Sequence, residues 1–286
     1  MTFNTIGIVP RLDNKYALDL SYKIYQYLKK HNLKVIPDED FAKKFALKNS
    51  SSLSKMDVDL IITVGGDGTV LKTCMNIPKP ETPILTINMG RRGILTEIGP
   101  KDAIKAIKKC IAGEFNLEKH DKLSILLGNE KIVDGLNEVL MASIMPWKMI
   151  DFEVALDGDF FLKSRADALI IATSTGSTAH ALSAGGPIVH ASLNAFVLIF
   201  LCPLEHISPI VIPSKNIIEV KSKNPKMKTF VTVDGRYQRW IEPEQKLTVK
   251  KSDKKAVFIR IEKSFTNKNL FRTLNPLKGG NLEYNE

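Results

Sequence analysis

Residues 60–72 read LIITVGGDGTVLK, five apolar or β-branched residues followed by a glycine-rich turn and a renewed apolar pattern with helical spacing. That order predicts a buried strand, a tight turn and the start of a helix. Gly65, Gly66 and Gly68 carry no Cβ atoms, so a phosphate can approach the backbone N–H groups there. Thr69 is expected to cap the helix, whose N-terminus favours an anion.

Asp67 lies among these phosphate-suited groups, although a carboxylate repels an anionic ligand. Its presence is explained if it holds a metal, orients a hydroxyl or takes a proton from one, and the sequence leaves these three roles open. A corner built only for turn geometry is the simpler alternative, but the full Gly-Gly-Asp-Gly-Thr run after a buried strand argues against it. The turn is neither a Walker loop nor a Gly-x-Gly-x-x-Gly dinucleotide motif, because the residues that those mechanisms need are missing.

The composition is that of an ordinary globular protein with 286 residues, 44% of them hydrophobic, which allows two modest domains or one large one. The start of the chain does not resemble a signal peptide, and the longest apolar run, residues 195–202, is too short to span a bilayer. We therefore expect a cytoplasmic protein. Cys74, Cys110 and Cys202 are widely spaced and odd in number, which suggests neither a disulfide framework nor a cysteine-based zinc site.

The net charge of +10 raises the question of an anionic partner. Most lysines fall on the polar faces of predicted helices or around a turn, which is typical of solvated surface. Aromatic residues make up only 7% of the chain, and no basic stripe is interleaved with them as in a nucleic-acid platform. Neither nucleic acid nor a membrane is expected as a partner.

Strand-like and helix-like runs alternate over residues 1–115. The predicted strands are 3–9, 33–36, 59–64 and 83–88, and the predicted helices are 13–30, 40–47 and 101–112. This alternation predicts an α/β domain with a parallel, doubly wound sheet. Ligands of such sheets bind beyond the carboxyl ends of the strands, where the glycine turn and Asn88 both fall.

Residues 116–264 contain nine short β-rich runs separated by turns, and almost no long helix. The runs are 123–127, 131–133, 152–156, 169–172, 196–201, 217–220, 229–233, 246–249 and 256–261. They predict an all-β second domain. A C-terminal segment, 265–286, contains Asn-Pro and Gly-Gly breakers, and its docking back on the first domain is an arrangement that the sequence leaves open.

Two further constellations lie in the β-rich half. Asn137 and Glu138 place an amide beside a carboxylate, a pair that could bracket the hydroxyls and amino edge of a nucleoside, with a plain polar turn as the alternative. Residues 167–187 combine a buried strand, a run of small hydroxyl residues and a helix start. Small side chains and glycine let a flat ring or a phosphate lie close to the backbone, and a capped helix packed on a strand is the alternative.

Taken together, these motifs resemble those of the NAD kinase family, the ATP- or polyphosphate-dependent NAD kinases. The matching segments are Gly65 to Thr69, residues 86–90 with 93–97, Asn137-Glu138, and residues 175–180 with 183–187. The first motif is shared with diacylglycerol and sphingosine kinases and, in similar form, with phosphofructokinases. The last is far more specific to NAD kinases.

The resemblance implies phosphorylation of the 2′-hydroxyl of the adenosine ribose of NAD, with Asp67 orienting and deprotonating that hydroxyl. Lys72 would contact the pyrophosphate side, Asn137 and Glu138 the adenosine, and Asp167 with Arg165 the nicotinamide half. The full set that the resemblance places around NAD and the phosphates is Gly65, Gly66, Gly68, Thr69, Lys72, Asn88, Asn137, Glu138, Lys148, Arg165, Asp167, Thr175, Thr178, Ala179, His180 and Ser183.

Phosphoryl transfer mainly requires positioning and charge neutralisation, so Mg²⁺ or another divalent cation should accompany ATP, although no dedicated metal cage is visible in the sequence. The resemblance also suggests a homodimer or homotetramer, in which a neighbouring subunit completes the pocket. Two other readings stay open: a lipid kinase of the diacylglycerol kinase type, and a dinucleotide-binding protein without turnover.

The chain departs from the family pattern at three places. His180 stands where tyrosine is usual, and Arg236 replaces the glutamine of Val-Asp-Gly-Gln. Residues 202–206, Cys-Pro-Leu-Glu-His, replace Cys-Pro-His-Ser. These changes could tune the choice between NAD and NADH, or between ATP and polyphosphate, and none of them touches Asp67.

Overall fold

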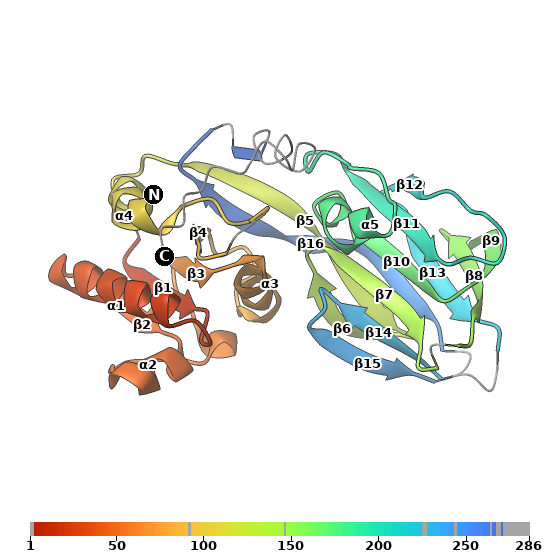
Figure 1. The fold of residues 1–286 in the computed structure, drawn as a ribbon, viewed down its shortest axis with the longest axis horizontal. Helices are drawn as coiled ribbons and strands as arrows, with labels where there is room; N and C mark the ends of the chain where they lie inside the picture. Colours follow the sequence, from red (N-terminus) through yellow and green to blue (C-terminus); the bar gives the residue numbers. More distant parts are fainter. Residues whose placement is uncertain are drawn as a thin grey trace, which may run out of the picture. The chain divides into compact units, whose positions relative to one another are not determined.

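The computed structural model describes residues 3–90, 93–145, 147–224, 228–242, 245–263, 265–266 and 270. The chain divides into two compact units, drawn in Figure 1. Unit 1 contains the residues up to Lys119 together with the described residues from Val257 onward, and unit 2 contains His120–Ala256. None of the helices in the described part of the chain has the length and apolarity that a bilayer crossing requires.

Unit 1 is an α/β domain whose strands are parallel, which confirms the predicted sheet. The strand order is β2-β1-β3-β4-β16. The elements are β1 (Thr5–Pro10), α1 (Lys15–Lys30), β2 (Lys34–Pro37), α2 (Glu39–Phe45), the 3-10 turn Leu53–Lys55, β3 (Leu60–Gly65), α3 (Asp67–Asn76), β4 (Ile84–Asn88), the 3-10 turn Pro100–Asp102, α4 (Ala103–Ile111) and the end of β16 (Leu247–Arg260).

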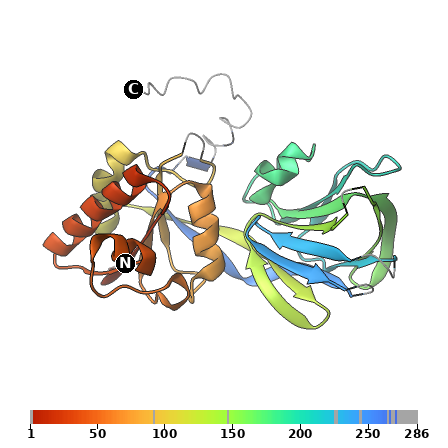
Figure 2. The same cartoon turned by 60° about the horizontal axis from the view of Figure 1, so that its bottom comes forward.

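Helices cover both faces of this sheet. One face packs against α1 and α4 through a cluster that includes Ile8, Ile62, Leu28 and Ile107, all at most 1% exposed. Helix α3 packs on β3 and lies on the other side of the strands from α1 (Figure 2). The six residues of β3 are all buried, because helices shield this central strand on both faces.

Unit 2 consists of two antiparallel sheets, which confirms the all-β prediction. One sheet has the order β6-β5-β16-β13-β8-β9 and the other β12-β11-β10-β7-β14-β15. The strands are β5 (Asn116–Leu127), β6 (Glu130–Gly135), β7 (Glu138–Ser143), β8 (Ile150–Leu156), β9 (Asp159–Ala166), β10 (Ala168–Thr173), β11 (Ala195–Leu201), β12 (Ile210–Pro213), β13 (Ile218–Ser222), β14 (Thr229–Val233) and β15 (Tyr237–Ile241). Phe152 of β8 and Phe200 of β11 meet edge to face at 5.7 Å, so the inner faces of the sheets pack together.

The two predicted strands 246–249 and 256–261 are in fact parts of one strand, the 14-residue β16. The polar run between them looked like a turn in the sequence. In the structure its lysines are held by a carboxylate, since Lys251 and Lys255 both pair with Asp121 of β5, at 2.6 and 3.3 Å.

Strand β16 also moves the predicted domain boundary. Residues 257–264 were expected in the second domain, but Phe258 and Ile259 pair with Ile84 and Leu85 of β4, in unit 1. The expected docking of 265–286 lies almost wholly outside the described residues.

Candidate active site

Helix α3 begins at Asp67, directly after the glycine turn. Its N-cap is Gly66 in extended conformation, with no side-chain cap, so the prediction that Thr69 caps the helix is wrong. Thr69 is the third helical residue and is only 8% exposed. A Cβ atom on Gly65 would collide with its hydroxyl, so Thr69 fills the space that this glycine leaves.

The two glycines that flank the turn differ in their surroundings. Gly65 has the Thr69 side chain against it, whereas a Cβ atom added to Gly66 would meet no heavy atom within 4 Å. Gly66 therefore borders open space at the N-terminus of a ten-residue helix, where backbone N–H groups favour an anion. Gly68 lies one residue inside the helix.

The carboxylate of Asp67 accepts four hydrogen bonds from the segment 94–96. Its Oδ2 atom accepts from the N–H of Ile94 at 2.8 Å. Its Oδ1 atom accepts from the N–H groups of Leu95 and Thr96, both at 3.2 Å. The Thr96 hydroxyl also donates to Oδ1, at 3.2 Å. Oδ1 is thus saturated, while Oδ2 keeps a lone pair for another donor.

Asn88 and Lys72 lie near this turn. Asn88 is opposite Gly65 in the parallel pairing of β3 and β4. Its side-chain oxygen accepts from the N–H of Gly90 at 2.8 Å, so it shapes the turn after β4. Lys72 is half-buried on α3, and its charge lowers the pKa of Asp38, although burial raises that pKa more strongly.

A second group of the expected site residues forms around Asp234 in unit 2. The carboxylate of Asp234 accepts from the backbone N–H groups of Leu136, Asn137 and Glu138 at 2.7, 2.8 and 3.1 Å. Gly176 packs on the same segment, because a Cβ atom there would collide with the Asn137 carbonyl. These contacts therefore join three segments into one cluster: the Asn-Glu pair, the hydroxyl-rich run and the Asp-Gly turn.

Glu138 is buried, with 8% of its surface exposed. Burial, together with the nearby Asp234, raises its pKa to about 8, and a hydrogen bond from the His180 backbone opposes this. Its Oε2 atom has no hydrogen-bond partner among the described residues. At neutral pH Glu138 is therefore mostly a neutral carboxyl that can donate as well as accept.

The pKa of Asp234 is also raised by burial, against the effect of its three backbone donors and of the charge of Lys122. Lys122 is a buried lysine, 2% exposed, and thus places a cation near the buried carboxyl of Asp234. Sequence reasoning missed Lys122, and it noted Asp234 only as part of a turn. A lysine at a position where the strand pattern predicts a buried side chain is rare, and this could have identified Lys122 as a candidate functional residue.

The hydroxyl run after β10 is largely used within the protein. Thr173 donates to the Leu136 carbonyl at 2.7 Å, and Ser174 to the Leu193 carbonyl at 2.5 Å. Ser177 donates to the Ser174 carbonyl at 2.7 Å and accepts from the N–H of Val189 at 3.0 Å. These bonds fix a 3-10 turn, Gly176–Thr178, and the four-residue helix α5, His180–Ser183.

The expected ligand-lining residues of this run differ in exposure. Thr175 is buried and its hydroxyl lies 2.7 Å from Nδ1 of His120, a residue that sequence reasoning also missed. Thr178 and Ala179 are half-buried, and His180 and Ser183 are exposed. The accessible part of the run is therefore its end, residues 178–183.

Arg165 and Asp167 lie elsewhere in unit 2. They flank the start of β10, whereas Thr175 follows its end, and the six residues of this strand extend about 17 Å at about 3.3 Å per residue. Lys148 belongs to the same end as Arg165, because it follows β7, which runs antiparallel to β10. The structure does not bring these three residues together with Glu138 within one chain.

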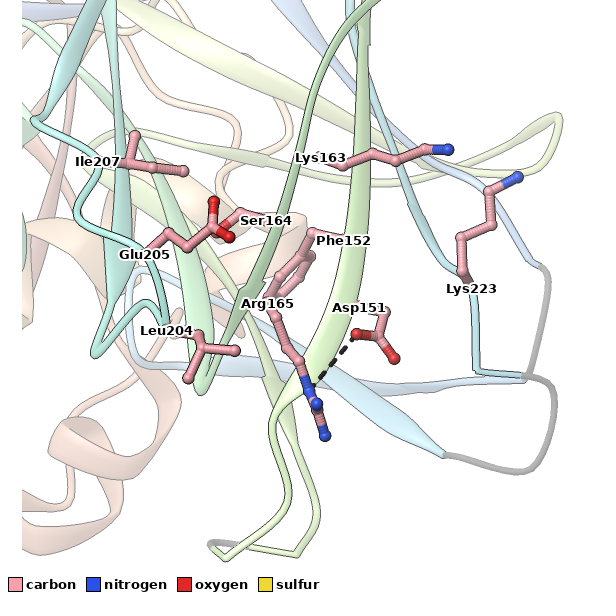
Figure 3. Close-up of a pocket in the computed structure, with 9 residues that line it drawn as sticks. All are labelled: Asp151, Phe152, Lys163, Ser164, Arg165, Leu204, Glu205, Ile207 and Lys223. Carbon is pink, nitrogen blue, oxygen red and sulfur yellow. Dashed lines mark ion pairs between the residues drawn. The ribbon is translucent and has the colours of Figure 1, made fainter.

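Arg165 lines a pocket of about 620 Å³ between the β8–β9 hairpin and residues 204–207 (Figure 3). Its Nε atom lies 3.5 Å from a carboxylate oxygen of Asp151, and the pair is exposed. Lys163 and Lys223 point to the outer side of the pocket and both pair with Glu153. The wall is thus mixed in charge, with Phe152 and Leu204 as its apolar part.

No group of three or more histidine, cysteine, aspartate or glutamate side chains suited to a metal ion occurs among the described residues. Both Asp67 oxygens already accept N–H donors. A magnesium ion at this turn would therefore take most of its ligands from phosphate and water, as such ions commonly do.

Family models match both parts of the chain. The ATP-NAD kinase N-terminal domain matches residues 6–115, and the ATP-NAD kinase C-terminal domain matches residues 136–261. A protein named NAD kinase from Methanothermobacter thermautotrophicus is 35% identical over 266 residues, which are 92% of this chain and 94% of its own. One from Thermococcus sibiricus is 39% identical over 258 residues, which are 89% of this chain and 93% of its own.

Solved structures agree with these matches. An NAD kinase from Archaeoglobus fulgidus in complex with ATP has a TM-score of 0.77 at 30% identity, over 94% of this chain and 98% of its own. Yeast NADH kinase complexed with NADH has a TM-score of 0.86 over 100% of this chain and 90% of its own. At 22% identity, the yeast likeness concerns the fold alone.

Proposed function

The chain belongs to the NAD kinase family, and from that premise we propose that it transfers a phosphoryl group from ATP to the 2′-hydroxyl of the adenosine ribose of NAD. The product is NADP. Another nucleoside triphosphate or polyphosphate is the alternative donor, and NADH the alternative acceptor. The observation that carries the proposal is Asp67, a carboxylate placed at an anion-favouring helix start beside the open Gly66.

Asp67 acts on the hydroxyl through Oδ2 in this proposal. Oδ1 is occupied by three donors, whereas Oδ2 accepts only the N–H of Ile94. A ribose hydroxyl can donate to the free lone pair of Oδ2, which orients its oxygen toward the γ-phosphorus of ATP. As the new O–P bond forms, the bond from that phosphorus to the bridging oxygen breaks, ADP leaves, and Oδ2 receives the hydroxyl proton. The donors on Oδ1 hold the carboxylate in place meanwhile.

The glycine turn holds phosphates. Gly66 borders open space and α3 presents its first N–H groups, which suits an anionic oxygen better than a side chain would. Gly65 and Thr69 support this geometry by close packing, Gly68 lies in the first turn of α3, and Asn88 shapes the neighbouring turn. Lys72 contributes a cation to the pyrophosphate side.

Asn137 and Glu138 hold the adenosine. Glu138 is mostly neutral near pH 7, since its pKa is raised to about 8, so it can offer an O–H donor to a ring nitrogen or a ribose oxygen. Asn137 is 8% exposed, with an amide that both donates and accepts. Thr175, Thr178, Ala179, His180 and Ser183 line the rest of this surface.

Arg165 and Asp167 serve the nicotinamide half, and Lys148 serves as an anion contact, from a neighbouring subunit in a homodimer or homotetramer. Their distance along β10 from Thr175 supports this, because one chain does not present both groups together. A mixing experiment tests it. If Arg165→Ala and Asp67→Asn chains are each inactive, then mixed oligomers should regain part of the activity, whereas continued inactivity would refute the shared pocket.

A divalent cation, Mg²⁺, accompanies ATP in this proposal and supplies neutralisation of the charge on the transferred phosphoryl group. The protein's own part in this proposal is to place the hydroxyl and the phosphates. We expect the reaction to take place in the cytoplasm.

The proposal is tested by incubating the purified chain with NAD, ATP and Mg²⁺ and following NADP with an NADP-specific dehydrogenase. Sustained NADP formation supports it, and replacing ATP by polyphosphate or NAD by NADH identifies the donor and acceptor. If no combination yields a 2′-phosphorylated product, the proposal fails. Calorimetry with NADP then separates a silent dinucleotide binder, which binds, from a lipid kinase, which does not.

A further inference from the structure

Arg260, the last residue of β16, is a buried cation in unit 1. It is 4% exposed, and its guanidinium lies over two aromatic rings, with Cζ 4.9 Å from the ring centre of Phe258 and 4.3 Å from that of Phe265. Its Nε atom donates to the carboxylate of Glu118, which also accepts the Thr266 hydroxyl. The planar group is therefore held by two aromatic contacts and by a carboxylate at one edge.

The other edge of Arg260 reaches the segment that holds Asp67. Its NH1 group donates to the carbonyl of Leu95 at 2.9 Å. The N–H of the same residue, Leu95, donates to Asp67 Oδ1 at 3.2 Å. Thr86 gives the Leu95 carbonyl a second donor, at 3.2 Å. One residue, Leu95, thus separates the guanidinium from the Asp67 carboxylate.

Glu97 ties the far end of the same segment to β16. Its Oε1 atom accepts from the N–H groups of Ile261 and Glu262 at 3.0 and 2.7 Å, and its Oε2 atom lies 3.9 Å from NH1 of Arg260. The side chains of Glu97 and Arg260 are 4% and 5% exposed. Burial raises the pKa of Glu97, and Arg260 opposes that shift.

Stability alone is a poor reason for such a cluster, because buried ion pairs can often be replaced by apolar side chains of similar volume without loss. An apolar side chain has no hydrogen-bond donors, so it cannot hold the Leu95 carbonyl, Glu118 and Glu97 in one fixed arrangement. A planar guanidinium with several donors does this.

We propose that Arg260 is a positioning residue for the phosphoryl transfer: it holds segment 94–97 so that the N–H groups of residues 94–96 keep the Asp67 carboxylate aimed. The assignment rests on the proposed function, since it gives Asp67 its role there. Arg260 acts only through Leu95 and Glu97 and touches no substrate.

The test uses the full chain with Arg260→Lys, which keeps the charge and the apolar stem but loses the planar fork. Thr86→Val is the second variant, because it removes the other donor to the Leu95 carbonyl without changing any charge. Arg239→Lys is the matched control, at a half-buried arginine that binds Glu130 through two hydrogen bonds of 2.8 Å in unit 2.

Two measurements are made on each variant. In hydrogen exchange, the amides of Ile94, Leu95 and Thr96 should exchange roughly tenfold faster in Arg260→Lys, with β10 unchanged. In the NADP assay, kcat should fall about tenfold or more with both KM values nearly unchanged, since small displacements of a reacting group are costly to the rate. Thr86→Val should change both in the same direction, by a smaller factor.

The outcomes are distinguishable. Unchanged amide exchange in both variants overturns the proposal. It is also overturned if exchange becomes faster in Arg260→Lys while the kcat of this variant equals that of Arg239→Lys. A fall in kcat that is explained wholly by a smaller folded fraction also overturns it. If the parent chain makes no NADP, the proposed function fails, whereas the exchange experiment still reports whether Arg260 holds the segment.

Discussion

Replacing Glu138 with glutamine should stabilise the folded chain at alkaline pH and reduce the dependence of its stability on pH. The folded chain keeps the Glu138 proton up to about pH 8, whereas in the unfolded chain the carboxyl has its ordinary pKa of 4.5. Between these values the folded state binds more protons than the unfolded state. The free energy of unfolding therefore falls as the pH rises through this range.

The size of the effect follows from the two pKa values. Moving a carboxyl from 4.5 to about 8 corresponds to about 5 kcal/mol, at about 1.4 kcal/mol for each factor of ten in the protonation equilibrium. Relaxation around the ionised group reduces this figure, so we expect a loss of about 2–5 kcal/mol in the parent. Glutamine has nearly the same shape and stays neutral, so Glu138→Gln should avoid this loss.

Urea unfolding followed by circular dichroism, at about pH 5, 7 and 9, measures the effect. Glu130→Gln is the control, because Glu130 is an exposed carboxyl whose pKa is lowered by its bond to Arg239. That control should not gain stability at alkaline pH. If parent and Glu138→Gln lose stability equally between about pH 5 and 9, then Glu138 is ionised in the folded chain and the reasoning is refuted.

Three further predictions concern the turns and the cation. Gly66→Ala should leave the melting temperature nearly unchanged, because the added methyl group meets no atom within 4 Å. The variant should raise KM for ATP, because the proposal places phosphate beside Gly66. An unchanged KM for ATP would place the phosphates elsewhere. Gly176→Ala should destabilise the chain by about 1–3 kcal/mol in thermal unfolding through its collision with Asn137, while Gly99→Ala, which meets open space, serves as control. Chelation with EDTA should abolish NADP formation without lowering the melting temperature, and activity that survives chelation would speak against a divalent cation.

The fold could be predicted from sequence where the hydrophobic pattern of a segment agrees with the burial of that segment in the structure. The run 60–65 is apolar because β3 is buried on both faces, so its strand could be identified from sequence. Strand β15, Tyr237–Ile241, was missed because only its last residue is buried and its sequence, YQRWI, is mostly polar. The polar middle of β16 was misread for a related reason, since its partner Asp121 lies far away in the sequence.

The candidate site was predictable where a motif is a contiguous run. Residues 65–69 and 175–180 could be proposed as site residues because each forms one continuous motif in the sequence. Lys122 and Arg260 do not, because each is a single cation whose role depends on acids brought near it by distant strands. The sequence also could not tell that most hydroxyls after β10 are bonded within the protein, which only the tertiary contacts define.

The most direct test of the account is the rate of NADP formation by Asp67→Asn, compared with that of the parent under saturating NAD, ATP and Mg²⁺. An amide in place of the carboxylate cannot take the hydroxyl proton, so kcat should fall by roughly 10²–10⁴-fold, the usual size of a general-base contribution. A variant that keeps the parent's rate would contradict the role assigned to Asp67.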